Sequence, residues 1–483
     1  MNDRQVFFKN KKILIYGFGK SGISCFNFLK KNNICKIFDD NKKNIPFKLR
    51  KELINVSKLS LISFDYIVLS PGIDIKKCKI SNYLKKNRSK IITELDIFEI
   101  SYPKINKITI TGTNGKSTTS KLLYEVLKNN RMDVRLTGNI GYPVLMEKRI
   151  KKNTIFVIEA SSYQLDYSKY FRSKYSVILN LNPDHLERHG TFKNYAEAKF
   201  KIVKSQGKNN YAFLDKENKF LSQLIKKNRL KSKITKVNYL KYKKYFKQID
   251  NVYFNNSSNK KNLSFVLAIA KTLNIKINKV INTANKFKGL NYRQQIIHKS
   301  KNLLIINDSK STSFSSTVPL LEAYENIHWI VGGQAKKGDK FKLKRKYFSN
   351  IKAYIYGKNR NFLINSLSNK IFYKSSLTLN EAIRNLNNNI KNDKQKKVSN
   401  DKQKKTVNSR EQMLNRAQLT RIFTVLRKLR DEDALSDANY RLMKTMCMFY
   451  DRNIVSLLKS SPPDDDQKLG QGLLNLLSQK DVI

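Results

Sequence analysis

A lysine and two hydroxyl residues follow a glycine-framed turn in the stretch KITITGTNGKSTTSKLL, residues 107–123. The apolar and β-branched residues before the turn predict a strand, and the residues after it predict a helix. In such a connection the backbone N–H groups of the turn and the helix N-terminus face one point and favour an anion there. Gly112 and Gly115 let the backbone approach that anion closely, because neither carries a side chain. The stretch therefore predicts a phosphate-binding loop.

The side chains at the end of this turn suit a nucleotide with its metal ion. Lys116 can reach the β- and γ-phosphates, and the hydroxyl of Ser117 or Thr118 can hold Mg²⁺. The usual phosphate-loop pattern, GxxxxGK(S/T), would need a glycine at Ile110, so this loop is a shorter variant.

Three further polar residues follow apolar runs. Glu159 closes the run IFVIE, and Asp184 and His185 come after the run YSVILNL. Because ligands of open α/β sheets bind at the carboxyl ends of the strands, we expect these residues near the phosphate loop. A carboxylate there could hold magnesium. Taken alone, Glu159 could instead stabilise a helix N-terminus, and His185 could be structural.

A second glycine-rich turn lies near the N-terminus, in GFGKSG. Gly17, Gly19 and Gly22 form a GxGxxG pattern, and Asp39 and Asp40 follow about 20 residues later. This spacing is typical of dinucleotide-binding domains, so a dehydrogenase is one interpretation. The chain offers no recognisable second site for hydride transfer, which disfavours that interpretation.

Strands alternate with helical stretches in three successive blocks, and each predicts a doubly wound sheet. We predict an α/β fold of three Rossmann-like domains, the third incomplete, plus a helical C-terminal tail. The domains are residues 1–103, 104–288 and 289–391, followed by a charged low-complexity linker, 392–407, and a helical tail, 408–483. The tail differs in composition, since it holds 7 of the 20 arginines and 4 of the 7 methionines.

The composition of the chain indicates where the protein is located and which partners it binds. No apolar run is long enough to span a membrane, and the start MNDRQVFFKNKK is too polar for a signal peptide. The cysteines, Cys25, Cys35, Cys78 and Cys447, form no CxxC pair and are interpreted as reduced thiols, so we expect a cytoplasmic protein. The formal charge of +59 is typical of nucleic-acid binding, but it comes mostly from lysine spread along the chain. AT-rich codons favour such a composition, so nucleic acid is not the expected partner.

Six motifs occur in the order seen in one enzyme family: GTNGKST, EASSYQL, NLNPDHLERHGT, YAEAKFKI, FKGLNYRQQ and NDSKSTS. Over about residues 10–390 the chain resembles the Mur ligases, and GFGKSGIS and SPGI favour the members that add D-glutamate. The resemblance implies a ligase of peptidoglycan synthesis, and hence of cell wall biogenesis, cell shape and cell division. ATP would phosphorylate the alanyl carboxylate of UDP-N-acetylmuramoyl-L-alanine, and the amine of D-glutamate would attack the acyl phosphate. It also implies ATP and Mg²⁺ as cofactors, and we expect a monomer.

The matching motifs imply the site residues. The implied catalytic residues are Lys116, Glu159, His185 and Lys199. The implied Mg²⁺ ligands are Ser117, Glu159, His185 and Lys199, the last as a carbamate, which would replace a repelling ammonium by negative oxygens. The implied ATP-binding residues are Gly112, Thr113, Asn114, Gly115, Lys116, Ser117, Thr118, Asn262, Arg293, Asp308 and Lys310. The implied substrate-binding residues are Gly17, Gly19, Ser21, Asp39, Ser70, Gly72, Asn139, Thr312 and Lys336.

The chain departs from the family pattern in two places. An asparagine expected three residues after Asn262 is Phe265. The serine-rich motif SPxxxSxDxF, which grips D-glutamate in the family, does not occur after Lys391. Two alternatives to an active ligase therefore stay open. One is a catalytically impaired protein that still binds ATP and the UDP-sugar, and the other is a basic ATPase that binds nucleic acid.

Overall fold

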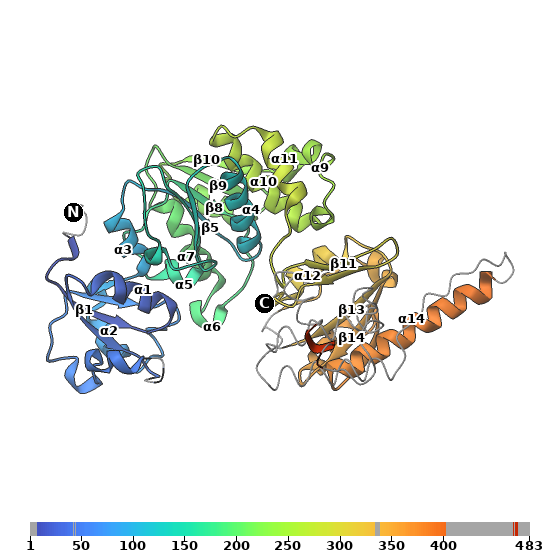
Figure 1. Ribbon diagram of the computed structural model, residues 1–483, viewed down its shortest axis with the longest axis horizontal. Coiled ribbons are helices and arrows are strands. Elements are labelled where there is room, and N and C mark those ends of the chain that lie inside the picture. The colour runs from blue at the N-terminus through green and yellow to red at the C-terminus, as the bar shows by residue number, and fades with distance from the viewer. Residues whose placement is uncertain are drawn as a thin grey trace. The chain divides into compact units, whose positions relative to one another are not determined.

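The computed structural model describes residues 7–41, 43, 45–333, 339–401, 467 and 469–471. The chain divides into two compact units, Met1–Asn388 and Asn389–Ile483. The sheets described below and the residues of the candidate site belong to the first unit (Figure 1). The predicted position of Lys336 and nearly all of the predicted helical tail lie outside the described residues.

The N-terminal sheet is a four-stranded parallel sheet with the order β2-β1-β3-β4. Apolar runs such as KILIY are almost wholly buried in it, as a parallel sheet covered on both faces requires. Its strands are β1 (Lys12–Tyr16), β2 (Ile34–Phe38), β3 (Tyr66–Leu69) and β4 (Ile91–Ile92). Its helices are α1 (Lys20–Leu29), η3 (Phe47–Glu52), η4 (Val56–Lys58), α2 (Ser81–Lys86), η5 (Arg88–Lys90) and α3 (Glu94–Ser101).

The central sheet has six parallel strands in the order β10-β9-β8-β5-β7-β6. Its strands are β5 (Asn106–Thr111), β6 (Val134–Gly138), β7 (Ile155–Glu159), β8 (Tyr175–Ile178), β9 (Tyr211–Asp215) and β10 (Lys233–Val237). Its α-helices are α4 (Lys116–Asn129), α5 (Ser162–Asp166), α6 (Leu186–His189), α7 (Phe192–Lys204), α8 (Lys219–Lys227), α9 (Lys243–Phe246), α10 (Ser257–Thr272) and α11 (Ile277–Lys286). Shorter 3-10 turns are η6 (Val144–Met146), η7 (Tyr239–Tyr242) and η8 (Val252–Phe254).

The strand order reverses at β5. The chain first adds β6 and β7 on one side of β5 and then β8, β9 and β10 on the other. Ile108 and Ile110 of β5 pack into one core with α4 and α10, whereas Phe156 and Ile158 of β7 pack into a second core with α7. Helices thus cover both faces of the sheet, and the reversal at β5 leaves the crevice where such sheets bind ligands. The predicted phosphate loop follows this strand directly.

The third region holds a parallel sheet, β13-β14-β15, and a separate antiparallel pair, β11-β12. The third block was predicted as one doubly wound sheet, and this hairpin departs from that prediction. Its second strand, β12, lies in the run NLLIINDS and pairs with β11 because only residues 300–303 separate the two strands. The strands are β11 (Gln295–Lys299), β12 (Leu304–Asn307), β13 (Ile327–Gly332), β14 (Ile351–Tyr356) and β15 (Phe372–Ser376). The helices are α12 (Phe314–Leu321), η9 (Arg345–Asn350), α13 (Arg360–Leu367) and α14 (Leu379–Asp401), and α14 extends into the predicted linker.

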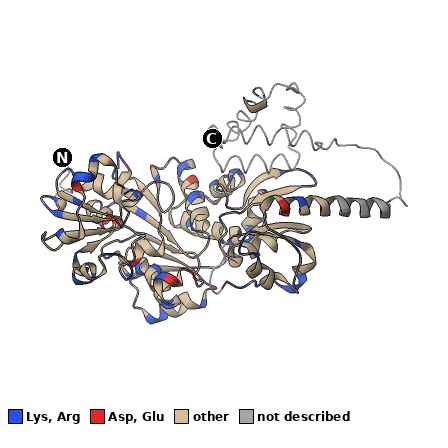
Figure 2. Ribbon diagram, turned by 90° about the horizontal axis from the view of Figure 1, so that it is seen from below, with Lys and Arg blue, Asp and Glu red and all other residues tan. Residues whose placement is uncertain are grey.

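Parallel strands alternating with helices confirm the predicted α/β class. Within the described part of the chain, no helix is both long and apolar enough to cross a bilayer. Figure 2 shows Lys and Arg distributed over many elements instead of on one element alone. This distribution favours a solvated basic surface over a single nucleic-acid-binding helix.

Asp96 on α3 is a fully buried acid that holds two parts of the chain together. Its Oδ2 accepts hydrogen bonds from the backbone N–H and the hydroxyl of Thr93, both at 2.9 Å, which closes a capping box. Its Oδ1 accepts from the Ser168 hydroxyl and from the backbone N–H groups of residues 169–171, at 2.7–3.1 Å. The carboxylate thereby fixes α3 to the loop that follows α5.

We expect Asp96→Ala to lower the free energy of unfolding by about 3 kcal/mol or more, because several buried donors would lose their acceptor. The shift of the urea unfolding midpoint measures this loss. Glu125→Ala is the control, since Glu125 makes only a partly exposed ion pair with Lys121 at 3.2 Å and should cost less than about 1 kcal/mol. Equal midpoints for the two variants would contradict the role of Asp96.

Candidate functional site

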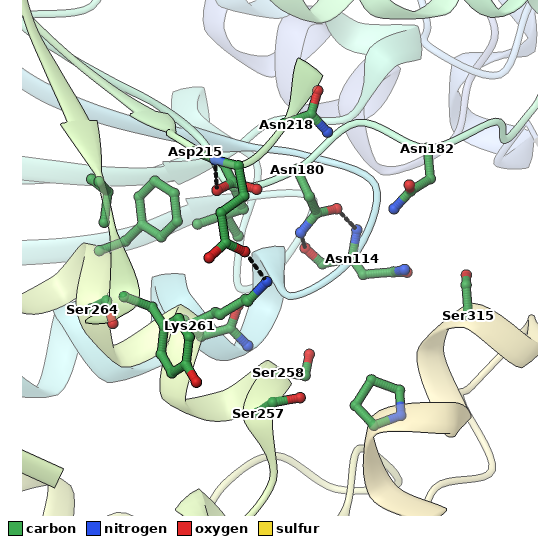
Figure 3. Close-up of a pocket in the computed structure, with 17 residues that line it drawn as sticks. Asn114, Asn180, Asn182, Asp215, Asn218, Ser257, Ser258, Lys261, Ser264 and Ser315 are labelled. Carbon is green, nitrogen blue, oxygen red and sulfur yellow. Dashed lines mark hydrogen bonds and ion pairs between the residues drawn. The ribbon is translucent and has the colours of Figure 1, made fainter. Parts of the chain in front are cut away.

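The phosphate loop connects β5 to α4 and is held by the end of the neighbouring strand. The backbone N–H groups of Thr113 and Asn114 donate to the backbone oxygen and the Oδ1 of Asn180, at 3.0 and 2.8 Å. The Asn180 Nδ2 donates to the Asn114 carbonyl at 3.0 Å (Figure 3). Asn180 thus holds the loop through both its backbone and its side chain. It opens the motif NLNPDHLERHGT, but the sequence alone assigned it no role. Its position just after the strand β8 was the available signal.

Gly115 cannot be replaced by a larger residue without strain. It is the N-cap of α4, with a left-handed φ of +84°. A Cβ built on it would lie 2.2 Å from the Oδ1 of Asn262, a buried residue of α10. Both the backbone conformation and the neighbouring amide therefore require glycine at this position.

Lys116 folds back over its own loop. Its Nζ donates to the carbonyl oxygens of Gly112 and Thr113, at 2.9 and 2.8 Å. Ser117 and Thr118 lie in the first turn of α4 and are largely buried. The structure therefore brings all the predicted phosphate-loop residues together at the carboxyl end of β5.

Glu159 ends β7 beside this loop and is 1% exposed. Its Oε1 accepts from the Asn139 Nδ2 at 3.0 Å, and the Asn139 backbone N–H donates to the Glu159 carbonyl at 2.9 Å. Its Oε2 is buried and has no hydrogen-bond partner among the described residues. Because an unpaired buried carboxylate oxygen is costly, this atom fits a bound cation.

Lys199 on α7 is 1% exposed, which is unusual for a lysine. Its Nζ lies 3.3 Å from the Thr111 Oγ1 and 4.9 Å from the centre of the Tyr195 ring. Burial, reinforced by the nearby Lys116 ammonium, holds the pKa of Lys199 well below its ordinary value, against the opposing pull of Asp184 and Glu159. This environment favours the uncharged, nucleophilic form of the amine over the ammonium.

Tyr195 joins α7 to the phosphate loop. It is the first residue of the motif YAEAKFKI, but the sequence alone assigned it no role. It is fully buried, and its hydroxyl lies 3.0 Å from the Thr113 Oγ1. The Thr113 hydroxyl in turn pairs with the backbone of Asn182, at 2.9 and 3.1 Å. The tyrosine ring below the Lys199 amine and its hydroxyl at the loop fix the two groups relative to each other.

His185 lies at the rim of the site, with 40% of its side chain exposed. It is the N-cap of α6 in a left-handed conformation, φ +53°. Its Nδ1 lies 3.0 Å from the Tyr163 hydroxyl, and its Nε2 lies 3.6 Å from the Asp184 carboxylate. Over the described residues, no group of three or more His, Cys, Asp and Glu forms a ligand cluster. A metal ion bound here would therefore also need a hydroxyl and a modified Lys199 as ligands.

A cavity of about 360 Å³ opens beside the loop (Figure 3). Asn262 lines it, and its Nδ2 lies 3.4 Å from the Oδ1 of Asn259, one turn earlier on α10. The amide expected at position 265 is replaced by Phe265, whereas the buried amide of Asn259 lies on the other side of Asn262. The other lining residues are Asn114, Leu179, Asn180, Asn182, Asp215, Glu217, Asn218, Val237, Tyr239, Ser257, Ser258, Lys261, Ser264, Phe265, Ser315 and Pro319.

The glycine-rich turn after β1 packs tightly against the turn after β3. Gly17 has φ +88°, and a Cβ there would lie 2.7 Å from the Ser70 Cβ. The Ser70 hydroxyl donates to the Gly17 carbonyl at 2.6 Å. The Asp39 Oδ2 accepts from the Phe18 N–H at 2.6 Å. Three predicted substrate residues, Gly17, Ser70 and Asp39, are therefore brought together here.

The remaining predicted residues of the N-terminal domain differ in accessibility. A Cβ built on Gly19 or on Gly72 would meet no atom within 4 Å, so space is open beside both. The Ser21 hydroxyl, by contrast, donates to Glu94 at 2.8 Å. The proton of Ser21 is therefore already engaged within the protein.

The third-region residues lie around the start of the β11-β12 hairpin. The Asp308 Oδ1 accepts from the Gln294 N–H at 3.0 Å, and burial raises the pKa of Asp308 to about 7. The Lys310 Nζ lies 5.4 Å from the Tyr292 ring centre. The Arg293 carbonyl lies 3.4 Å from the Tyr253 hydroxyl, and Thr312 is exposed.

Comparison with known proteins gives consistent matches. The family model for the Mur ligase middle domain matches residues 110–287, and that for the MurD-like N-terminal domain matches residues 11–92. The UDP-N-acetylmuramoylalanine--D-glutamate ligase of Rickettsia felis is 32% identical over 400 residues, covering 77% of this chain and 87% of the relative. The enzyme of the same name from Buchnera aphidicola is 34% identical, covering 77% and 89%. The solved structure of MurF from Acinetobacter baumannii is 17% identical with a TM-score of 0.49, covering 62% and 73%.

We expect Gly115→Ala to weaken ADP binding at least tenfold, because the methyl group would displace Asn262 and distort the loop. Isothermal titration with ADP measures the affinity. Gly357→Ala is the control, since Gly357 has φ +95° but a Cβ placed on it would meet no atom within 4 Å, and this variant should bind ADP normally. Unchanged affinity in the Gly115 variant would refute the role of this turn.

Proposed function

The chain belongs to the Mur ligase family, and on that basis we propose that it joins D-glutamate to UDP-N-acetylmuramoyl-L-alanine at the expense of ATP. The observation that carries the proposal is the group formed by the partly exposed Lys116 of the loop and the buried Glu159 and Lys199, at the carboxyl edge of the central sheet. Curated relatives that carry this activity in their names match over most of the chain. The reaction belongs to peptidoglycan precursor synthesis.

The phosphate loop would bind the triphosphate of ATP. The N-terminus of α4, which begins at Lys116, favours its negative charge. Lys116 would leave its two loop carbonyls and contact the γ-phosphate, where its charge stabilises the phosphoryl group in transfer. The lysine already lies over the loop, so only a short movement of its side chain is needed.

The adenosine would lie in the cavity beside the loop. Asn262 offers its amide there, and Asp308, Arg293 and Lys310 would complete the nucleotide site from the third region. The cavity volume of about 360 Å³ is in the range of small-molecule sites.

Mg²⁺ fits the acidic side of the loop. Glu159 would supply its buried Oε2, which has no hydrogen-bond partner in the described part of the chain, and Ser117 its hydroxyl. His185 and a carbamylated Lys199 would supply the remaining protein ligands. The ion would neutralise charge on the phosphoryl oxygens. Asn139, already bonded to Glu159, holds that carboxylate in position.

The carbamate of Lys199 follows from the chemistry of its amine. An uncharged Nζ can add to the carbon of CO₂, forming an N–C bond and releasing one proton to water. The product carries a negative charge, which the neighbouring Lys116 favours, whereas it disfavours an ammonium.

The uridine nucleotide would bind to the N-terminal domain. The turn at Gly17 and Gly19 precedes α1, whose first turn has no acidic residue and no side-chain cap, so its N-terminus favours a diphosphate. Asp39, Ser70, Gly72 and Ser21 surround that turn. Thr312 and Lys336 would meet D-glutamate. Because ATP and the UDP-sugar are charged and do not cross membranes unaided, we place the reaction in the cytoplasm. We expect the protein to act as a monomer.

We expect Lys199→Ala to lose at least 100-fold in ATP-dependent product formation and to recover part of it with added acetate or propionate. The short carboxylate would replace the missing oxygens of the carbamate. Lys204→Ala is the control, because Lys204 lies on the same helix in an exposed pair with Glu197 and should keep full activity. Full activity of the Lys199 variant together with an unmodified lysine mass would disprove the carbamate.

The missing SPxxxSxDxF motif leads to a prediction about the second half-reaction. The residues for nucleotide binding and acyl-phosphate formation are present, but the part that orients D-glutamate in the family is absent after Lys391. A loosely held amine loses the proximity advantage, which is worth roughly 7–11 kcal/mol in the best-oriented systems. We therefore expect acyl-phosphate formation to survive better than amide formation.

The test supplies ATP, UDP-N-acetylmuramoyl-L-alanine and either D-glutamate or hydroxylamine, a small nucleophile that needs no site. We expect hydroxamate to exceed the D-glutamyl product, and a reaction without ATP is the control. D-glutamyl product formed faster than hydroxamate would show that another part of the chain restores the amino-acid site. No ATP-dependent product with either nucleophile would refute the ligase, and phosphate release that depends on nucleic acid would favour the basic ATPase.

A further inference from the structure

Glu94, the first residue of α3, accepts hydrogen bonds from two other elements. Its Oε2 accepts from the Ser21 hydroxyl at 2.8 Å, and its Oε1 accepts from the Ser24 hydroxyl at 3.0 Å. The same Oε1 lies 3.4 Å from the backbone N–H of Leu145. The residue is 5% exposed, so these three donors replace water around the carboxylate.

The donors belong to the two segments proposed to hold the substrate. Ser21 lies in the first turn of α1, two residues after Gly19 of the glycine-rich turn. Leu145 lies in η6, six residues after Asn139, whose side chain holds the Glu159 carboxylate. One carboxylate therefore connects the turn beside the proposed diphosphate with the loop beside the proposed metal.

We propose that Glu94 is a positioning residue that holds the start of α1 and the loop 139–145 in the arrangement needed to bind the uridine nucleotide substrate. The inference rests on the proposed function, because that function places the nucleotide at the start of α1. It assigns Glu94 no contact with the reacting atoms.

The contacts explain why a carboxylate is needed. Two hydroxyls and one N–H converge on it, and each directs its proton to this buried group. A carboxylate can accept from all three at once, since it has two oxygens with about four lone-pair sites. A glutamine offers one acceptor oxygen and would force one serine to turn its hydroxyl and accept instead.

The experiment compares the full chain with Glu94→Ala and Glu94→Gln, using Glu99→Gln as the matched control. Glu99 is a second mostly buried acid on α3, but it pairs with Lys107 at 3.0 Å, on the strand β5, instead of with α1 or η6. Titration calorimetry measures the Kd of UDP-N-acetylmuramoyl-L-alanine and, separately, the Kd of ADP. Thermal unfolding of each variant reports its stability.

We expect the Kd of the uridine substrate to rise about tenfold in Glu94→Ala and about threefold in Glu94→Gln, with the Kd of ADP changed less than twofold. Glu99→Gln should lose stability without this selective change. An equal loss of affinity for both ligands, or a selective loss in the Glu99 variant as well, would reduce Glu94 to a structural role and overturn the inference. If the Ala variant does not fold, the same comparison in the Gln variant decides.

Failure of the proposed function gives a different result. In that case the unchanged chain binds ADP but not UDP-N-acetylmuramoyl-L-alanine, and the inference about Glu94 is overturned together with it. Wild-type binding of the uridine substrate with unchanged binding in both Glu94 variants overturns the inference alone.

Discussion

The exclusion of water from the Lys199 amine is the constraint on which the candidate site depends. Burial and the neighbouring Lys116 both disfavour an ammonium here, so the pKa of Lys199 lies well below its ordinary value. The Glu159 Oε2 lies buried nearby without a hydrogen-bond partner among the described residues, so this acceptor lacks a donor or a cation. A cation with a carbamylated lysine would relieve both, so ligand binding would also stabilise the fold.

The doubly wound central sheet creates this exclusion. Because the strand order reverses at β5, the loops after β5, β7 and β8 meet at one edge without a crossing connection above them. The loop after β5 supplies the N–H groups, β7 supplies Glu159, and Asn180 after β8 fixes the loop. The helix α7 covers one face of the sheet and brings Lys199 to the same edge.

The helix α3 has a corresponding role between the N-terminal and central parts of the first unit. Three of its acids are largely buried, and each contacts a different element: Glu94 contacts α1 and η6, Asp96 the loop after α5, and Glu99 the strand β5 through Lys107. Buried carboxylates are costly unless every one is paired. Their pairing restricts how the proposed substrate-binding segments can shift with respect to α3. This short helix therefore links the N-terminal segments to the central ones.

The sequence by itself determined the α/β class, the family and the strand–turn–helix of the predicted phosphate loop, because glycine spacing and apolar runs are local patterns that short stretches encode. The roles of the site residues, the domain limits and the tail stay predictions, and Lys336 lies outside the described residues. Only the tertiary structure revealed the contacts of Asn180, Tyr195, Asn259 and Glu94. It alone showed that one Glu159 oxygen has no hydrogen-bond partner among the described residues. These features arise from contacts such as Ser21 with Glu94, 73 residues apart, or Thr113 with Tyr195, 82 residues apart. A burial that shifts a pKa, or a hydrogen bond between distant segments, depends on which surfaces the fold brings together, and no local pattern carries that information.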